Sequence, residues 1–119
     1  MRELVKASKA LSDEIRLRIL NVLTERECCV CEVMQALEIT QARASRNLSA
    51  LYDAGFLKLR HDGLWSLYSI DTEGSKQYCV DLIQAVTKAL EGNETASLDR
   101  QRLRSAERIG PGCARRVAG

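Results

Sequence analysis

The sequence contains no run of apolar residues that approaches the roughly 20 needed to cross a membrane. Its first 25 residues are charged throughout and lack both the apolar core and the small-residue cleavage site of a signal peptide. We therefore expect a cytoplasmic protein with no membrane partner. No internal repeat is visible, and a length of 119 residues is typical of one domain.

The sequence also lacks the parts that a thiol enzyme needs. It has no glycine-rich loop to hold a phosphate-type anion, and no strand leads into a cysteine loop. The single histidine, His61, lies in a predicted hairpin, so a catalytic base beside a cysteine is missing as well. We therefore predict that the chain is not an enzyme.

What the sequence does contain is a cluster of thiols. Three of the five cysteines, Cys28, Cys29 and Cys31, fall within four positions. Cytosolic cysteines stay reduced, and clustered ones more often bind metals or take part in redox chemistry than form structural disulfides. The odd number of cysteines also excludes a complete set of internal disulfides. The cluster is therefore a candidate metal or redox site.

Hydrophobic periodicity predicts a mainly α-helical chain with one small β-hairpin. Apolar residues recur at helical spacing through most of the chain, but they alternate around Asp62-Gly63, a dipeptide typical of tight hairpin turns. Ser12 and Thr40 are predicted N-caps, and Gly55 is a predicted helix stop. The predicted helices cover residues up to about 11, then about 13–24, 30–37, 41–54, 75–90 and, more weakly, 93–109.

Two predicted helices joined by a short turn and followed by a hairpin have the order of a winged helix-turn-helix. The second of these helices buries Ala44, Leu48 and Leu51 and presents polar and basic side chains from its first turns. Amide, guanidinium and hydroxyl groups recognise base edges in the major groove, and the hairpin would contact the DNA backbone or the minor groove. We therefore expect double-stranded operator DNA as a partner, contacted through Gln41, Arg43, Ser45, Arg46, Arg60 and His61.

The predicted helix over residues 75–90 carries an apolar stripe that is wider than one small domain needs. Such a stripe suggests a partner helix from a second copy, so we expect a homodimer with two recognition helices about one turn of DNA apart. The expected fold is a winged helix-turn-helix of order ααααββα(α). DNA binding and dimerisation are assigned to residues 1–92, a weak C-terminal helix to 93–109 and a disordered tail to 110–119.

Residues 5 to about 90 resemble the ArsR/SmtB family of bacterial metal-responsive repressors. The resemblance rests on the segments ALSDEIRLRIL, CVCEVMQAL and TQARASRNLSALYDAGFLKLRHDGLWSLYSI, and on their order and spacing. In arsenic-sensing members the third helix opens with a cysteine-valine-cysteine motif, and a third cysteine follows three positions later. The resemblance maps these cysteines onto Cys29, Cys31 and Met34, of which the last departs from the family pattern.

The resemblance implies a repressor that leaves its operator when a trivalent metalloid, arsenite or antimonite, binds cysteine thiolates. Such an ion favours three sulfur ligands, and the thioether of Met34 offers no charge to replace a thiolate. The third sulfur, beside Cys29 and Cys31, would then come from Cys28, the nearest cysteine in sequence, or from Cys113 in the tail.

The spacing of Cys29 and Cys31 places a geometric condition on such a site. Residues i and i+2 of a regular helix point about 200° apart, so the two thiols cannot bind one ion from within an intact helix. Either binding unwinds the start of the third helix, or that helix begins after Cys29. Because the third helix supports the recognition helix, its distortion would displace the DNA contacts between Gln41 and Arg46.

Two alternatives to metalloid sensing stay open at this point. Cys28 and Cys31 have the C-x-x-C spacing of redox-active thiols, and a helix N-terminus lowers the pKa of a thiol, so a redox or persulfide sensor is one alternative. A sensor of cadmium or lead, bound by the same thiolates, is the other. A zinc site on the helix near residues 75–90 is not expected, because that segment has acidic residues but no histidine.

Overall fold

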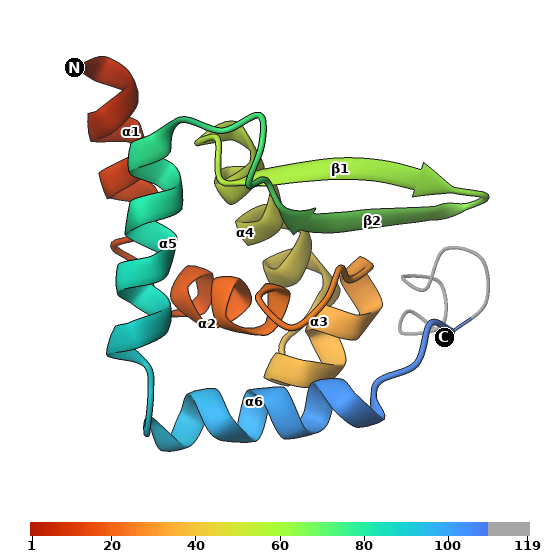
Figure 1. Ribbon diagram of the computed structural model, residues 1–119. Coiled ribbons are helices and arrows are strands. Elements are labelled where there is room, and N and C mark those ends of the chain that lie inside the picture. Colours follow the sequence, from red (N-terminus) through yellow and green to blue (C-terminus); the bar gives the residue numbers. More distant parts are fainter. Residues whose placement is uncertain (110–119) are drawn as a thin grey trace.

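The computed structural model describes residues 1–109, which form six helices and one two-stranded antiparallel sheet (Figure 1). This confirms the predicted fold class and element order. Within these residues no helix is both long and apolar enough to span a membrane. The segment predicted to be a disordered tail, 110–119, lies outside the described residues. The elements are α1 (Arg2–Ala10), α2 (Glu14–Leu23), α3 (Val30–Leu37), α4 (Gln41–Asp53), β1 (Leu57–Asp62), β2 (Trp65–Ile70), α5 (Gln77–Ala89) and α6 (Glu94–Ser105).

Side chains at the helix starts account for where α2 and α4 begin. The N-cap of α2 is Asp13, whose carboxylate accepts a hydrogen bond from the backbone N–H of Arg16 at 3.2 Å. The prediction that Ser12 caps this helix is wrong, because the Ser12 hydroxyl donates to the Lys9 carbonyl at 2.7 Å and so closes the end of α1. Thr40 caps α4 as predicted.

A three-residue turn joins α3 to α4 and forms the helix-turn-helix. It contains Glu38, whose φ of 57° and ψ of 49° lie in the left-handed region that residues other than glycine and asparagine seldom adopt. This conformation ends α3 sharply and lets Thr40 start the next helix. At its other end α4 stops before Gly55, which has a φ of 94°, as the sequence predicted.

The two strands form the hairpin, or wing, that the Asp62-Gly63 pattern predicted. They pair antiparallel in a register that places Arg60 opposite Leu67, and Gly63 turns the chain with a φ of 62°. The hairpin projects away from the helices in Figure 1. Leu64 at its tip is 74% exposed, whereas Leu67 is fully buried against the body of the protein. The wing therefore has a free tip and a base that is part of the core.

The main core is built around α2 and α4 and includes Ile19, Leu20, Leu48, Leu51 and Phe56, all with at most 1% exposure. In Figure 1, α5 stands upright on one side of α2 and crosses it at a steep angle, and α6 passes below α2 and α3. Both helices thus cover the domain that carries the helix-turn-helix.

A buried ion pair fixes α6 against α2. Asp99 of α6 has no exposed surface and accepts two hydrogen bonds of 2.8 Å from the guanidinium of Arg18, which raises the pKa of that arginine. Arg102 donates a third bond of 2.8 Å to the same carboxylate, and Arg18 also donates to the Leu37 carbonyl at the end of α3. Because a buried pair is costly unless its hydrogen bonds are satisfied, this network specifies one position for α6.

Candidate functional site

The sulfur atoms of Cys29 and Cys31 meet at the start of α3. Cys29 is the N-cap residue and has extended backbone geometry (φ −83°, ψ 171°), whereas Cys31 is the second residue of the helix. Their Sγ atoms lie 3.0 Å apart, and both residues are 1% exposed. The helix therefore begins after Cys29, which is the second of the two predicted arrangements. Because the cap residue is extended, its side chain escapes the 200° separation of a regular helix, and no unwinding is needed to bring the sulfurs together.

The wall beside this thiol pair comes from the wing. The fully buried Leu67 and the half-buried Trp65, both on β2, pack with Cys29 and Cys31 in a cluster separate from the main core. The pair thus lies between a helix that leads to the recognition helix and a strand of the hairpin.

Cys28 is directed away from the pair. Its backbone forms an isolated antiparallel bridge with Tyr68, and its side chain belongs to the main core. Side chains of successive extended residues point to opposite sides, which separates Cys28 from Cys29. Burial raises the pKa of the Cys28 thiol to about 12. The structure therefore brings together two of the three predicted sulfur ligands, and among residues 1–109 no group of three potential metal-ligating side chains is assembled.

Burial raises the pKa of Cys29 as well, and the nearby carboxylate of Glu32 adds to the effect. The sequence had suggested the opposite, since a helix N-terminus favours a thiolate. In the structure desolvation outweighs the effect of the helix end. Cys29 is therefore protonated at neutral pH before any ligand binds.

Glu32 stands at the centre of the contacts that hold the start of α3. Its carboxylate accepts from the Cys29 N–H at 2.9 Å and from the guanidinium groups of Arg108, also at 2.9 Å, and Arg26. Burial alone would raise the pKa of Glu32, but the three hydrogen bonds outweigh this effect and hold the pKa below its usual range. Glu32 is thus ionised, 3% exposed and fully engaged.

The segment after α6 covers the thiol pair. The backbone carbonyl of Glu107 lies 3.8 Å from the Cys31 Sγ. The Gln35 side chain donates to the same carbonyl at 2.8 Å and accepts from the Glu107 N–H at 3.1 Å. With the Arg108–Glu32 pair, these contacts bind the chain end to α3. These contacts could not be predicted from the sequence, because nothing in the local pattern indicates a contact over more than 70 positions.

The remaining sulfurs have different positions. Met34 is 6% exposed and packs in the main core, as a structural residue would. Cys79 at the start of α5 is 1% exposed and also belongs to the main core. Cys113, the other proposed source of a third sulfur, lies outside the described residues.

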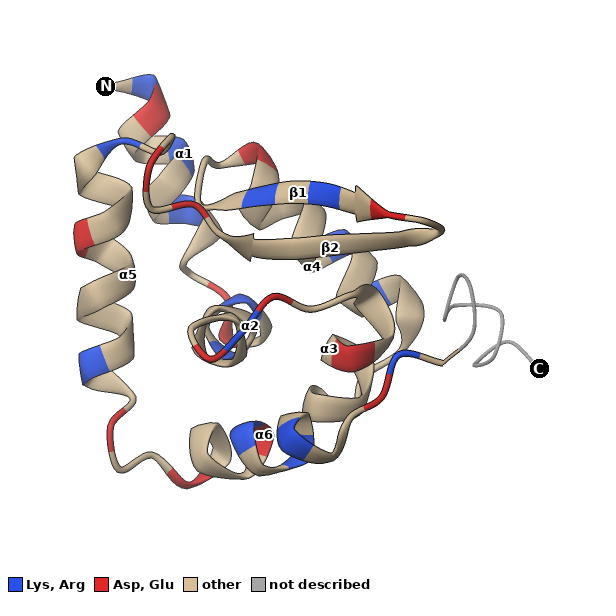
Figure 2. Ribbon diagram, turned by 45° about the vertical axis from the view of Figure 1, so that its right-hand side comes forward, with Lys and Arg blue, Asp and Glu red and all other residues tan. Residues whose placement is uncertain are grey.

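The predicted DNA-binding residues gather on α4 and the wing. On α4, Arg43 and Arg46 are exposed, and Gln41 and Ser45 are partly exposed, while Ala44, Leu48 and Leu51 are buried on the opposite side, as the helical spacing predicted. Figure 2 shows the basic bands that Lys58 and Arg60 place on β1. His61 is exposed on the same strand, and its Nδ1 atom lies 3.3 Å from the Ser66 hydroxyl oxygen.

One residue that positions α4 was missed in the sequence. Asn47 is 8% exposed and accepts a 3.0 Å hydrogen bond from Arg16 of α2, while its amide donates to the Arg43 carbonyl at 2.8 Å. An asparagine in the middle of a basic helix resembles a base-contacting residue, but this one connects the recognition helix to the helix behind it.

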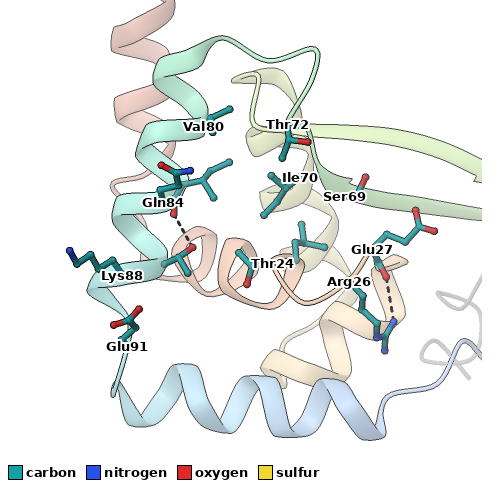
Figure 3. Close-up of a pocket in the computed structure, with 13 residues that line it drawn as sticks. Thr24, Arg26, Glu27, Ser69, Ile70, Thr72, Val80, Gln84, Lys88 and Glu91 are labelled. Carbon is teal, nitrogen blue, oxygen red and sulfur yellow. Dashed lines mark hydrogen bonds between the residues drawn. The ribbon is translucent and has the colours of Figure 1, made fainter.

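A pocket of about 550 Å³ lies elsewhere, between α5, β2 and the end of α2 (Figure 3). Its lining includes Ile70, Val80 and Gln84, with Arg26 and Glu27 at the end nearest α3, and no cysteine is among its described lining residues. This pocket is therefore distinct from the site of Cys29 and Cys31.

Comparison with known proteins agrees with the geometry. Residues 13–58 match the family model described as bacterial regulatory protein, arsR family. A cadmium resistance transcriptional regulatory protein CadC homolog of Staphylococcus aureus is 42% identical over 76 residues, which cover 63% of this chain and 63% of that protein. The arsenic resistance transcriptional regulator ArsR1 of Pseudomonas putida is 42% identical over 66 residues, 55% of this chain and 52% of that protein. The chain thus spans between half and two thirds of the length of these two relatives.

A match that covers a larger share of the relative involves the arsenical resistance operon repressor of Bacillus subtilis, which is 35% identical over 74 residues, 61% of this chain and 70% of that protein. Among solved structures, HlyU of Vibrio cholerae superposes with a TM-score of 0.64 at 26% identity, covering 74% of this chain and 91% of HlyU. Mb0332 of Mycobacterium bovis has a TM-score of 0.64 at 26% identity, and the match covers 78% of this chain and 82% of Mb0332. Mb0332 is described as a homodimeric winged helix-turn-helix DNA-binding domain. These matches, together with the helix-turn-helix and wing, show that the chain belongs to the arsR family of bacterial regulatory proteins.

Proposed function

We propose that the protein is a homodimeric, DNA-binding repressor that leaves its operator when arsenite or antimonite binds Cys29 and Cys31. One observation carries this proposal: the two buried Sγ atoms lie 3.0 Å apart at the start of α3, the helix that leads through a three-residue turn into α4. The names of the relatives support it, since they describe regulators of arsenical and cadmium resistance.

The chemistry of the pair suits a trivalent metalloid. Arsenous acid, As(OH)₃, reacts with two thiols to give HO–As(SR)₂ and two molecules of water. Two As–S bonds form, two As–O bonds break, and each thiol proton leaves with a hydroxyl group as water. Neither arsenic nor sulfur changes oxidation state, so no oxidant or reductant is needed. The raised pKa of Cys29 is therefore no obstacle, because the reaction uses the protonated thiol.

The separation of the sulfurs also suits one bridging ion. For bonds of about 2.3 Å, the metal–sulfur length of zinc thiolates, two sulfurs on one ion lie about 3.8 Å apart at a tetrahedral angle and about 3.3 Å apart at a right angle. The observed 3.0 Å is close to the second value, which is the angle expected of a pyramidal ion. Binding therefore requires the sulfurs to move apart by only a few tenths of an ångström.

Movement at the start of α3 has a direct path to the recognition helix. At its other end α3 is held by Arg18 and Arg102, which donate to the carbonyls of Leu37 at 3.1 Å and Ala36 at 2.7 Å. A ligand that binds better to a displaced α3 shifts the population toward that state and away from the state that fits DNA. This is the physical basis of release from the operator.

Two other kinds of inducer are alternatives to the metalloid. Cadmium or lead would bind the same two thiolates, and the cadmium regulator from S. aureus is 42% identical to this chain. Oxidation by a peroxide is the other, since the sulfurs already lie close and the reaction 2 RSH + H₂O₂ → RSSR + 2 H₂O would join them. One of the similar solved structures is described as reduced HlyU, which keeps a thiol-based response among the candidates.

The third ligand of the metalloid could come from Cys28, from Cys113 or from a hydroxide. Cys28 is directed into the main core, so its recruitment would require the bridge to Tyr68 to open. Cys113 follows Glu107 by six positions, and an extended chain of that length spans up to about 20 Å. A retained hydroxide on arsenic completes the coordination without either cysteine.

Arsenite binding to the four single variants Cys28→Ser, Cys29→Ser, Cys31→Ser and Cys113→Ser tests this assignment. We expect binding to be lost in the Cys29 and Cys31 variants and retained in the Cys28 variant. Loss in the Cys113 variant would identify the third sulfur, and retention would assign the third position to hydroxide. Full binding after removal of Cys29 or Cys31 would contradict the proposed site.

A further inference from the structure

The segment that carries the thiols is joined to the wing as well as to α3. Leu67 and Trp65 of β2 pack directly against Cys29 and Cys31. Two hydrogen bonds connect the Cys28 backbone to Tyr68, one of 2.9 Å from the Cys28 N–H and one of 2.8 Å to its carbonyl. A displacement of residues 28–31 therefore cannot occur without a response in β2, because close-packed side chains and paired backbones transmit small shifts.

Glu27 extends this connection to the outer strand of the wing. Its carboxylate accepts from both donor nitrogens on one side of the Arg60 guanidinium, with Nε at 2.9 Å and the terminal nitrogen also in contact. This two-point contact fixes the plane of the guanidinium. Arg60 remains 57% exposed and lies on β1, where its backbone is opposite that of Leu67. Glu27, the residue immediately before the cysteine cluster, thus holds the guanidinium of Arg60, which is a predicted DNA contact.

The value of this pair is geometric rather than energetic. Exposed ion pairs contribute little to stability. Glu27 and Arg60 are nevertheless 33 positions apart in sequence, and one belongs to the thiol segment and the other to the wing. Figure 3 shows Glu27 lying just below β2, between the end of α2 and the hairpin. No comparable contact joins the thiol segment to α4 among the hydrogen bonds and ion pairs described for residues 27–31.

We infer that Glu27 is a positioning residue that couples the thiol pair to the DNA contact of the wing. An ion bound at Cys29 and Cys31 displaces the segment, Glu27 moves with it, and Arg60 is withdrawn from the DNA phosphate that it contacts in the repressing state. The wing is then a second route from the thiols to the operator, beside the route through α3 and α4. This inference rests on the proposed function, because it requires that a thiol ligand releases the DNA.

The test compares Glu27→Gln with Glu25→Gln in the full-length protein. Glu25 is a matched control, since its side chain is 28% exposed against 29% for Glu27, but its partners are Arg104 and Arg100 of α6 rather than the wing. For each protein the dissociation constant of a selected operator duplex is measured with and without sodium arsenite, at several salt concentrations. Arsenite binding to the free protein is measured separately through the fluorescence of Trp65, the only tryptophan.

We expect arsenite to bind all three proteins alike. The ratio of the two dissociation constants should fall about fivefold or more in Glu27→Gln, the lower bound of typical coupling between sites, and stay unchanged in Glu25→Gln. Arsenite should also reduce the salt slope of operator binding in the wild type by about 0.9 per lost phosphate contact, with a smaller reduction in Glu27→Gln. An equal ratio and an equal change of slope in both variants would overturn the inference while leaving the proposed function intact. Failure of arsenite to release the wild type would overturn both.

Discussion

The pH dependence of ligand binding distinguishes a metalloid sensor from a cadmium sensor at the same two thiols. Burial raises the pKa of Cys29, so its thiol carries a proton at neutral pH. Binding of Cd²⁺ must expel the thiol protons into solution, whereas arsenous acid takes them up as water. The perturbation is therefore a change of pH between about 6 and 7, where an ordinary thiol, with a pKa of about 8.5, stays protonated.

The expected magnitude follows from the number of protons released. Each proton that leaves on binding changes the affinity tenfold per pH unit, so two thiols give cadmium about a hundredfold gain in affinity from pH 6 to pH 7. Arsenite affinity should change by less than about twofold over the same interval, because no net proton is released when protonated thiols react. Both statements depend on the burial of the pair and on the raised pKa of Cys29.

Isothermal titration calorimetry in two buffers of different ionisation enthalpy counts the released protons directly, and Trp65 fluorescence provides an independent affinity. The reasoning would be refuted if cadmium affinity were flat and arsenite affinity fell as the pH rose. That pattern belongs to thiols that are already ionised, and it would mean that the helix N-terminus outweighs burial at Cys29.

Three further predictions concern the framework around the site. Replacing Asp99 by alanine should lower the free energy of unfolding by about 3 kcal/mol, because Arg18 loses its buried partner but keeps some access to water; urea unfolding measures this, and an unchanged midpoint would contradict the structural role of the pair. Since the pKa of Glu32 is lower in the folded chain than its ordinary value of 4.5, its stabilising contribution is present above that pH and is lost as the pH falls through the folded value. Glu32→Gln should therefore flatten the acid limb of a thermal-stability profile, and an identical limb in both proteins would argue against the contacts described. Cys28→Ser should cost about 1–3 kcal/mol, since a hydroxyl is placed in an apolar core, yet leave arsenite affinity unchanged; a loss of arsenite binding in a stably folded variant would show that Cys28 is a ligand.

Local patterns in the sequence were sufficient for the helix-turn-helix. The segment 30–37 was predicted from its apolar face, and α3 occupies those residues. Thr40 and Gly55 were predicted to bound the next helix, and they do. These features depend on side chains within a few positions of one another, which is the range over which capping and periodicity act. Ser12 failed as a predicted cap because two adjacent residues were both suitable and only one could take the position.

Features that depend on long-range contacts could not be predicted. The separation of Cys28 from Cys29 follows from an extended backbone that is held by Tyr68, forty positions away. The placement of α6 follows from the Arg18–Asp99 pair, whose members are 81 positions apart. A weak C-terminal helix was predicted over these residues, but no local pattern indicates that Asp99 is buried. In each case the deciding interaction joins residues that no local pattern connects.

The proposed function requires above all that a ligand at Cys29 and Cys31 controls DNA binding. The most direct measurement is the affinity of the protein for a duplex selected from random DNA, with and without arsenite, in the wild type and in the Cys29→Ser/Cys31→Ser double variant. We expect arsenite to weaken wild-type binding by between about 5-fold and 150-fold, the usual range of coupling between two sites, and to leave the double variant bound. Equal affinities of the wild type with and without arsenite, or equal release of the double variant, would contradict the claim.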